Sequence, residues 1–419
     1  MNVLLVGSGG REHAIVWKLL QSEKIDKLYC APGNAGISED AICVPIGAME
    51  FDKLIAFAKE NAIDLTVIGM DDPLVGGIVD AFEAEGLRVF GPRKNAAIIE
   101  GSKAFSKELM KKYGIPTANY ETFDNYDAAV SYVKDQDLPI VLKADGLALG
   151  KGVIICNTLM EAFDGLKEIM VDKKFGASGN KVVIEEFLTG QEISVLSFCD
   201  GKTVKPMVSA QDHKRALDGD KGLNTGGMGT FSPSRIYTDE IAEECMKTIF
   251  QPTVDAMAKE GREFKGVLYF GLMLTEKGMR VIEYNARFGD PEAQVVLPRL
   301  KTDLIDVMEH CIDGTLDEID VEWSNNAAVC VILASGGYPQ SYEKGYEITG
   351  LDYVKGTNDL IAFHAGTALK DGKFVTNGGR VLGITGIGKT LDEAIVKAYK
   401  GVLLVDFEKK HFRKDIGVK

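Results

Sequence analysis

The chain has 419 residues, of which 45% are hydrophobic and 26% are charged, an ordinary composition for a globular protein. One hydrophobic core does not organise a chain of this length, so roughly two to four domains are expected. The formal net charge of −14 argues against nucleic acid as a partner, because a phosphate-binding surface needs a basic excess. Scattered cysteines, no signal peptide and no apolar run of about 18 residues predict a cytoplasmic protein that binds no membrane.

Residues 1 to about 100 alternate short β-rich runs with helical patterns. This alternation predicts a doubly wound parallel sheet. The predicted strands are 2–6, 27–31, 65–69 and 87–91, and the predicted helices are 11–20, 51–60 and 73–85. A short helical stretch over 102–113 then leads into Gly114-Ile115-Pro116, a boundary signal.

The pattern changes from about residue 119, where the strand-like runs YETF, PIVLKA, GVIIC and KVVIEEF follow with helical patterns near 125–135 and 159–170. A long glycine-rich loop at about 211–232 and a helix near 239–259 come next. The last segment opens with AAVCVILAS and is predicted to be a small α+β domain. We therefore predict an α/β and α+β multidomain chain divided into 1–103, 104–324 (a mobile part at 119–190 and a large part at 191–324) and 325–419.

The run VIEYNARFGDPE, residues 281–292, carries the most specific polar pattern in the chain. Glu283, Asn285 and Arg287 alternate along an extended segment, so their side chains leave one face of a strand. A carboxylate and an amide oxygen suit an oxygen-loving cation such as Mg²⁺, and an arginine beside them suits a carboxylate or phosphate. The pattern predicts a metal site.

The first strand runs into GSGGREH, residues 7–13, which opens the first helix. Backbone N–H groups at such a helix start make an anion site. Glu12 stands where the third glycine of a dinucleotide fingerprint belongs, and the second strand ends in APGN without the ribose-binding acid. A nicotinamide-dependent oxidoreductase is therefore disfavoured; a smaller phosphate, or a tight turn without any ligand, fits the loop.

Two further segments are compatible with a nucleotide. Lys143 ends an apolar strand before the glycine-rich loop 145–152, which could fold over phosphates with help from Lys151. Glu185 and Glu186 end another strand, where backbone and acid could hold an adenine edge and a ribose. The alternatives are a snorkelling lysine beside a flexible hairpin and an acidic strand end in solvent.

A long polar loop combines QDHKR (211–215) with NTGGMG (224–229). Such a concentration of basic, acidic and glycine residues suits a substrate loop that becomes ordered on binding. The alternative is an exposed insertion without function. No Ser-His-Asp or Cys-His arrangement is legible, so no covalent nucleophile is predicted.

Taken together, these blocks resemble the phosphoribosylamine–glycine ligase family of the ATP-grasp superfamily. The resemblance runs in order from residue 3 to about 416, and its blocks are GSGGREH (7–13), APGNAG (31–36), GSKAF (101–105), KADGLALGKGV (143–153), QDHKR, NTGGMG, RFGDPEAQ (287–294) and RKDIG (413–417). Two positions depart from the family. Asp71 stands where the family has a glutamate, and Ala286 stands where it often has a cysteine, so no thiol chemistry is required there.

The resemblance implies a role for each matching residue, and a central two-part ATP-grasp fold. Glu283 and Asn285 would bind Mg²⁺ or Mn²⁺. The ATP contacts would be Lys103, Lys143, Gly146, Glu185, Glu186, Phe187, Leu188 and Glu192. The phosphoribosylamine site would include Gly9, Gly10, Arg11, Asn34 and Asp71. Asp212 and Arg287 would face glycine and the transferring phosphate, and the catalytic set would be Arg287, Lys143, Asp212 and Asp290.

The implied reaction joins glycine to 5-phosphoribosylamine with ATP, through glycyl phosphate, as the second step of de novo purine synthesis. The implied partners are these small molecules, with a monomer and transient contacts to other enzymes of the pathway as further expectations. The alternatives are another ATP-grasp ligase of purine synthesis, which would carry other substrate loops, and a catalytically inactive nucleotide-binding regulator. The presence of Lys143, Glu283, Asn285 and Arg287 counts against an inactive regulator.

Overall fold

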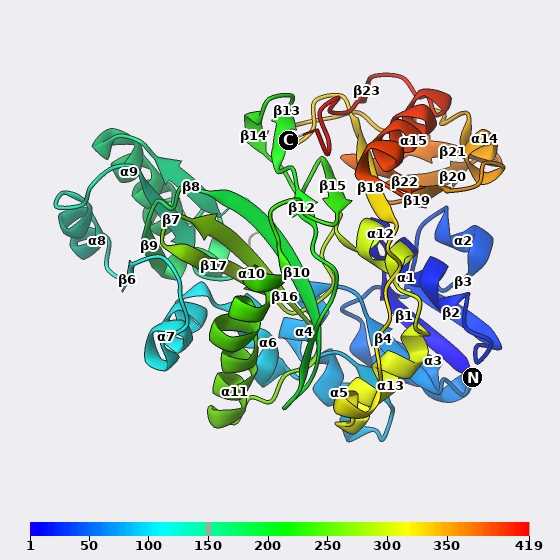
Figure 1. The fold of residues 1–419 in the computed structure, drawn as a ribbon, viewed down its shortest axis with the longest axis horizontal. Coiled ribbons are helices and arrows are strands. Elements are labelled where there is room, and N and C mark those ends of the chain that lie inside the picture. The colour runs from blue at the N-terminus through cyan, green and yellow to red at the C-terminus, as the bar shows by residue number, and fades with distance from the viewer. Residues whose placement is uncertain (148–151, 419) are drawn as a thin grey trace.

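The computed structural model describes residues 1–147 and 152–418 (Figure 1). Four sheets of four or more strands, each with its helices, make up the described chain. Within these residues, no helix is long and apolar enough to cross a membrane.

The N-terminal sheet has the order β3-β2-β1-β4-β5, and all of its strand pairs are parallel. The predicted doubly wound sheet is therefore confirmed. Its strands are β1 Asn2–Gly7, β2 Lys27–Pro32, β3 Ile42–Cys43, β4 Leu65–Ile68 and β5 Val89–Phe90, and its helices are α1 Gly10–Leu19, α2 Ile37–Asp40, α3 Phe51–Glu60, α4 Asp71–Gly76, α5 Ile78–Ala84 and α6 Lys94–Gly101. The helix predicted at 73–85 is divided in two, because Gly77 adopts a left-handed φ of +98° that interrupts it.

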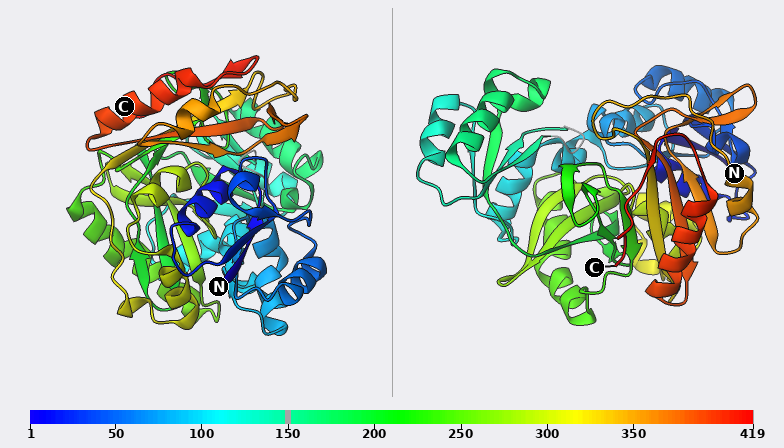
Figure 2. Two further views of the ribbon diagram at one scale, coloured as in Figure 1. Left: turned by 90° about the vertical axis from the view of Figure 1, so that its right-hand side faces the viewer. Right: turned by 90° about the horizontal axis from the view of Figure 1, so that it is seen from above.

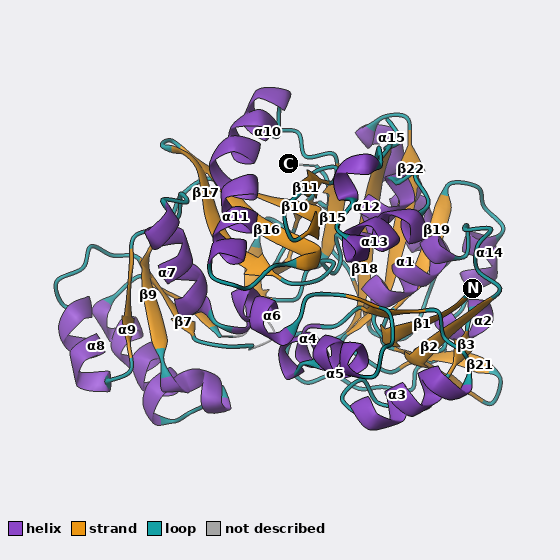
Figure 3. Ribbon diagram, turned by 90° about the horizontal axis from the view of Figure 1, so that it is seen from below, coloured by secondary structure: helices purple, strands orange, loops and turns teal. Residues whose placement is uncertain are grey.

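A separate lobe follows the helix α7 Lys103–Tyr113 and is set off to one side of the molecule (Figure 3). Its antiparallel sheet has the order β6-β9-β7-β8. The lobe has its own apolar core, to which Leu142, Leu166 and Ile184 contribute, so it packs as a unit. Its elements are β6 Tyr120–Phe123, α8 Tyr126–Val133, β7 Ile140–Ala144, β8 Val153–Cys156, α9 Leu159–Leu166 and β9 Val182–Glu186, all four strands as predicted.

The large central sheet has the antiparallel order β11-β10-β16-β17. Its strands are β10 Gln191–Asp200, β11 Val204–Pro206, β16 Lys265–Thr275 and β17 Gly278–Asn285. The helix predicted near 239–259 consists of α10 Asp239–Cys245 and α11 Gln251–Lys259, joined by one π-helical turn. Phe250 of that turn packs on Phe270 of β16, with ring centroids 4.5 Å apart. The helices α12 Ala293–Val296 and α13 Leu304–Asp313 follow the sheet in the chain.

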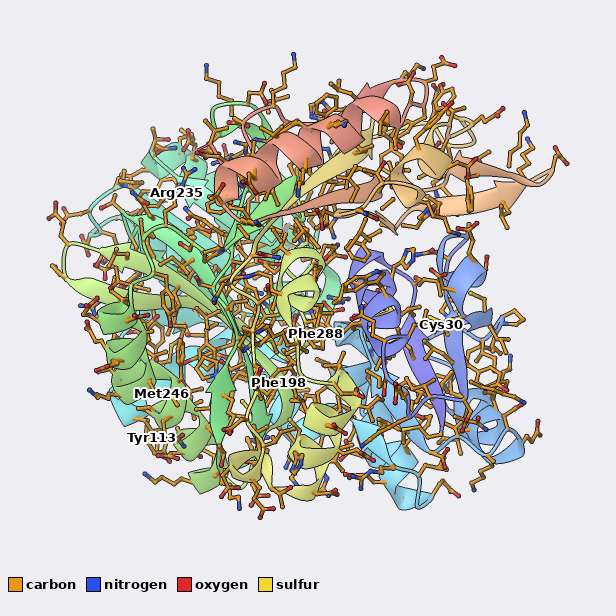
Figure 4. The ribbon with its side chains drawn as sticks, turned by 45° about the vertical axis from the view of Figure 1, so that its right-hand side comes forward. Cys30, Tyr113, Phe198, Arg235, Met246 and Phe288 are labelled. Atoms are coloured by element: carbon orange, nitrogen blue, oxygen red, sulfur yellow. The ribbon has the colours of Figure 1, made fainter. Side chains whose placement is uncertain are left out.

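The loop after β17 is anchored to this sheet by an aromatic pair. Phe198 of β10 and Phe288 lie with their ring centroids 6.3 Å apart, and both are buried inside the molecule (Figure 4). This contact fixes where the chain goes after the predicted metal strand.

The C-terminal sheet has the order β12-β15-β18-β22-β19, and β23 also pairs with β18. The sheet takes β12 and β15 from before residue 324, so the segment predicted as 325–419 shares its sheet with the preceding one. Figure 2 shows this region packed against both the N-terminal and central parts. Its elements are β12 Gln211–Asp212, β15 Gly229–Ser232, β18 Ala327–Ser335, α14 Leu351–Lys355, β19 Leu360–His364, β22 Arg380–Gly388, α15 Leu391–Leu404 and β23 Lys410–His411, with the small ribbons β13 Arg215–Leu217 with β14 Lys221–Asn224 and β20 Thr367–Lys370 with β21 Lys373–Thr376.

Candidate active site

One cavity of about 1030 Å³ brings the sequence-predicted residues together. Its wall comes from α7, the lobe strands β7 and β9, the central strand β17 and the C-terminal sheet. Of the predicted residues, those in the wall are Arg11, Asp71, Lys103, Lys143, Gly146, Glu185, Glu186, Phe187, Leu188, Glu192, Asp212, Glu283, Asn285, Arg287 and Asp290. Segments more than 200 residues apart in the chain therefore meet at one place.

The end of β17 carries the predicted metal-binding pair. Glu283 and Asn285 both line the cavity, whereas the ring of Tyr284 between them packs on Phe270 and its hydroxyl lies 3.0 Å from Thr253 Oγ1. The shared face predicted for Glu283 and Asn285 is thus present. Arg287 also lines the cavity, although it lies two residues beyond the end of the strand.

Glu283 lies in a strongly cationic environment. Lys214 is 3.5 Å from its carboxylate, and this ammonium holds the pKa of Glu283 below its ordinary value, with Lys143 and Lys103 adding to the effect. The carboxylate is therefore ionised at neutral pH. Together with the amide oxygen of Asn285 it offers the hard oxygen ligands that Mg²⁺ prefers.

No group of three His, Cys, Asp or Glu side chains suited to a metal occurs in the described part of the chain. A cation held by Glu283 and Asn285 would therefore take its remaining ligands from phosphate oxygens and water.

Arg287 is held by two acids that come from elsewhere in the chain. Its guanidinium lies 2.8 Å from Glu100 and 3.6 Å from Asp71, and it donates to Asn285 Oδ1 at 3.2 Å. Glu100 also accepts from the Ala286 backbone N–H at 2.7 Å. Glu100, which sequence reasoning missed, thus fixes both the side chain of Arg287 and the backbone before it.

The buried lysines near β7 form a triplet with one acid. Lys143 lies 2.9 Å from Glu185 Oε1, and Lys107 lies 3.0 Å from Glu185 Oε2. Burial lowers the pKa of Lys107 to about 8, with Glu185 opposing that change. The carboxylate predicted to contact ATP is therefore engaged by two ammonium groups of the protein.

The start of α7 is tied to the glycine-rich loop. Lys103 donates to Gly146 O at 2.7 Å, and Asp145 accepts from Ser102 Oγ at 2.9 Å and from the Ala104 N–H at 3.1 Å. Burial lowers the pKa of Lys103. Lys151, which we expected to assist at the phosphates, lies outside the described residues.

The segment after β9 forms one part of the cavity wall and contributes both apolar and charged side chains. The side chain of Glu186 turns to Asn119, whose N–H donates to it at 2.9 Å. Phe187 and Leu188 follow in the wall, and Glu192 pairs with Lys214 at 3.3 Å. The geometry suits a flat heterocycle against Phe187 and Leu188, with polar backbone at its edge.

Asp212 shares the cavity lining with a second acid, Glu292. Burial, and then the nearby carboxylate of Glu292, raise the pKa of Asp212 well above its ordinary value. Glu292 itself accepts from Ser194 Oγ and Tyr269 OH, each at 3.0 Å. A cationic group, such as the ammonium of an amino acid, would be stabilised between two such carboxylates.

The predicted phosphoribosylamine residues divide into two groups. Arg11 and Asp71 line the cavity, whereas Gly9, Gly10 and Asn34 are not among the described residues of its lining. The Gly9 N–H donates to Glu12 at 2.5 Å, so a protein carboxylate occupies a place where a phosphate was expected. Asn34 donates to Ser8 O and His364 O, both at 2.9 Å, and thereby holds the N-terminal part to the C-terminal sheet.

Asp290 joins the same two parts of the molecule. Arg380 lies 3.3 Å from its carboxylate, and Gln294 donates to it at 2.9 Å. Burial raises the pKa of Asp290, but Arg380 and Arg11 outweigh burial and leave it below its ordinary value. An ionised carboxylate between two arginines orients them toward the cavity.

Sequence reasoning missed four residues that structure the site: Glu100, Lys107, Glu292 and Arg380. A signal existed for two of them. Lys107 follows Lys103 by one helical turn, so both face one way, and Glu292 is the last residue of the RFGDPE run. Glu100 and Arg380 carry no local signal because their partners are distant in sequence.

Comparisons with known proteins agree with this architecture. The family models for phosphoribosylglycinamide synthetase match as the N domain over residues 1–100, the ATP-grasp (A) domain over 101–293 and the C domain over 328–419. A phosphoribosylamine–glycine ligase of Halalkalibacterium halodurans is 52% identical, covering 100% of this chain and 97% of the relative. One of Brucella melitensis is 49% identical with 100% and 97% covered.

Solved structures extend the comparison. The crystal structure of phosphoribosylamine–glycine ligase from Thermotoga maritima has a TM-score of 0.86 at 37% identity, covering 99% of this chain and 100% of that one. A biotin carboxylase from Campylobacter jejuni has a TM-score of 0.74 at 13% identity, with 100% and 94% covered, and shares the fold alone. The chain belongs to the phosphoribosylglycinamide synthetase family.

Proposed function

We propose that the chain ligates glycine to 5-phosphoribosylamine at the expense of ATP, giving glycinamide ribonucleotide, ADP and phosphate. This is the second step of de novo purine synthesis. The observation that carries the proposal is the convergence of Glu283, Asn285, Arg287 and Lys143 with the Asp212–Glu292 pair on one cavity. That wall offers sites for a metal-bound nucleotide and an amino acid side by side.

The ATP phosphates would lie among Lys103, Lys143 and Glu283. Glu283 and Asn285 would hold Mg²⁺ or Mn²⁺, which supplies charge neutralisation at the phosphates when bound. The adenine would lie against Phe187 and Leu188, with Gly146, Glu186 and Glu192 nearby. In this arrangement Glu185 acts mainly by orienting Lys143.

The first step activates glycine, because a carboxylate is a poor acyl donor. A glycine oxygen attacks the γ-phosphorus of ATP, the bond to the bridging oxygen breaks, and ADP leaves with glycyl phosphate formed. Phosphoryl transfer of this kind asks the protein mainly for positioning and charge stabilisation. Arg287 and Lys143 stabilise the transferring group, and Asp212 binds the glycine ammonium.

The second step forms the amide. The amine of 5-phosphoribosylamine attacks the acyl carbon, the acyl–oxygen bond breaks, and inorganic phosphate leaves while the nitrogen gives up a proton. Arg11 and Asp71 in the cavity wall would hold the ribosyl substrate. Gly9, Gly10, Asn34 and Asp290 would shape that site from behind or beside it.

The test is ADP release in the presence of different acyl donors. Sustained ADP release should require both glycine and 5-phosphoribosylamine, and bicarbonate or formate should not replace glycine. Turnover with bicarbonate or formate instead would indicate another ligase of purine synthesis. ATP binding without turnover on any donor would indicate a regulator.

Three finer expectations accompany this proposal. We propose a cytoplasmic location and a monomer that contacts other enzymes of the pathway transiently. We also propose the domain limits 1–103, 104–324 and 325–419, with 119–190 moving as a unit. The separate apolar core of the lobe supports such a motion.

A further inference from the structure

The hairpin formed by β13 and β14 is poorly supported by its own strands. In the described part of the chain, these two strands pair only with each other. Leu217 and Leu223 on it are 49% and 51% exposed, so little apolar surface is buried there. Because an isolated two-stranded hairpin is marginally stable in water, other contacts must hold it in place.

The main contact is made by a buried arginine, Arg413, from residues 411–416, called here the C-terminal segment. Arg413 is 0% exposed, and its guanidinium makes a two-point contact with Asp415 at 2.8 and 2.7 Å. The same group donates to Asp220 at 2.9 Å and to Arg215 O at 3.1 Å, both in the hairpin. Charge-assisted, two-point bonds of this kind are among the strongest polar contacts in proteins.

Three more bonds join the same segment to the hairpin. The Lys414 N–H donates to Asp218 at 2.8 Å, and the Gly219 N–H donates to Asp415 at 2.8 Å. His411 Nε2 lies 2.8 Å from Ala216 O. Figure 1 shows the red segment that follows β23 beside β13 and β14. The tip of the hairpin is thus held from the C-terminal side at several points.

The C-terminal segment is itself firmly anchored. Tyr399 of α15 donates to Arg413 O at 2.8 Å and accepts from the Ile416 N–H at 2.9 Å. β23, in which the segment begins at His411, pairs with the central strand β18 of its sheet. A rigid frame therefore presents Arg413 to the hairpin.

The hairpin and its flanks carry side chains into the cavity. Lys214, directly before β13, lies 3.3 Å from Glu192 and 3.5 Å from Glu283. Asp220 and Asn224 also line the cavity. The base of the hairpin has separate supports, because Arg380 donates to Gly226 O at 2.7 Å. The tip depends on the C-terminal contacts.

We propose that residues 411–416 form a clasp that holds the substrate hairpin 215–224 in its binding position, with Arg413 as the positioning residue. This rests on the proposed function for its kinetic consequence only. Without the clasp the hairpin opens part of the time, and only the closed fraction places Asp220 and Asn224 in the cavity wall. Apparent affinity then falls by that fraction, whereas a saturating substrate restores the closed state.

The experiment compares the full chain with Arg413→Met by hydrogen–deuterium exchange and by steady-state kinetics. Exchange of the backbone amides in 215–224 should rise about 10-fold or more, and exchange in β10 and β16 should not change. The KM for ATP with Mg²⁺ should rise about 10-fold, while kcat changes less than about threefold. Loss of folded protein alone would instead lower kcat and leave KM unchanged.

Two further variants make the test decisive. Arg235→Met is the matched control, because Arg235 donates to the Val418 carbonyl at 3.3 Å and pairs with Asp392 at 3.8 Å, neither of which belongs to the hairpin. If Arg413→Met does not fold, Asp218→Ala removes one clasp bond at an exposed site and should show a smaller effect in the same direction.

Each result bears on a separate claim. Unchanged exchange in 215–224 would overturn the clasp, and faster exchange with an unchanged KM would overturn the positioning role. Exchange does not require turnover. Absence of glycine-dependent ADP release from the unmodified chain would therefore reject the proposed reaction while the clasp is still tested.

Discussion

Glu283 and Glu185 are both strand-end carboxylates beside lysines, but they differ in exposure. The Glu283 side chain is 34% exposed and faces the cavity, with Lys214 at 3.5 Å. The Glu185 side chain is 4% exposed and lies between Lys107 and Lys143 at 3.0 and 2.9 Å. Glu283 can therefore exchange its lysine for a metal ion, whereas Glu185 cannot leave Lys107 and Lys143 without leaving two buried charges unpaired. The same local chemistry serves binding in one place and structure in the other.

The largest expected loss of activity is at the partly exposed carboxylate, Glu283. Glu283→Ala should lower kcat/KM for glycine-dependent ADP release by about 10²–10³-fold, because one preorganised charge at the phosphates is lost. The free energy of unfolding should change by less than about 1 kcal/mol, since the site is open to solvent. Enzyme kinetics and urea unfolding measure the two quantities.

The control for this variant is Glu276→Ala, an exposed acid in the turn between β16 and β17. It should leave both quantities unchanged. Near-normal turnover of Glu283→Ala would remove Glu283 from the metal site and would erase the contrast with Glu185.

Substitution of the buried carboxylate, Glu185, should mainly lower the stability of the fold, whereas substitution of Glu283 mainly lowers activity. Glu185→Ala leaves Lys107 and Lys143 buried without their acid, which should cost about 3–5 kcal/mol of unfolding free energy. Urea unfolding measures this loss, and activity should be assayed well below the melting temperature. A loss under about 1 kcal/mol combined with a 10²-fold fall in activity would instead make Glu185 a direct ligand contact, as the sequence had suggested.

Much of the fold was predictable because its signals are local. The four lobe strands and the parallel N-terminal sheet follow from periodicity and glycine boundaries, and both are present. The two-residue strand β3 was missed, because two residues carry no period. The mixed origin of the C-terminal sheet was missed as well, since pairing of β15 with β18 joins residues about 100 apart in the chain.

In the candidate site, too, residues with a local sequence pattern were predictable, and those that depend on distant partners were not. Glu283, Asn285 and Arg287 share one short segment, so alternation alone placed them together. The partners of two of them come from elsewhere in the chain: Glu100 for Arg287 and Lys214 for Glu283. Asp212 likewise has a distant partner in Glu292. The Gly9 loop looked like a phosphate site in sequence, but only the structure reveals that Glu12 accepts from its N–H. Burial and charge pairing are properties of the assembled chain.

The smallest expected effect is a pH dependence at the buried triplet. The pKa of Lys107 falls from the ordinary 10.5 to about 8 in the folded chain, because burial disfavours its charge. Between those two values the unfolded chain binds more protons than the folded one, so stability should rise with pH through this window. Below about pH 8 both states are protonated and the full cost of burying the charge remains. Unfolding free energies from pH 7 to 10.5 should therefore increase by up to roughly 3 kcal/mol more in the unmodified chain than in Lys107→Met.

Lys111 provides a matched control for this measurement. Its ammonium lies 5.7 Å from the centre of the Tyr120 ring, and that of Lys107 lies 5.5 Å from it, but Lys111 is exposed to solvent whereas Lys107 is buried. Lys111→Met should keep the pH dependence of the unmodified chain. Parallel curves for Lys107→Met and the unmodified chain would mean that Lys107 stays fully charged in the fold. Burial would then cost the Lys107–Glu185 pair no measurable free energy. Glu185 and Glu283 would differ in solvent exposure alone.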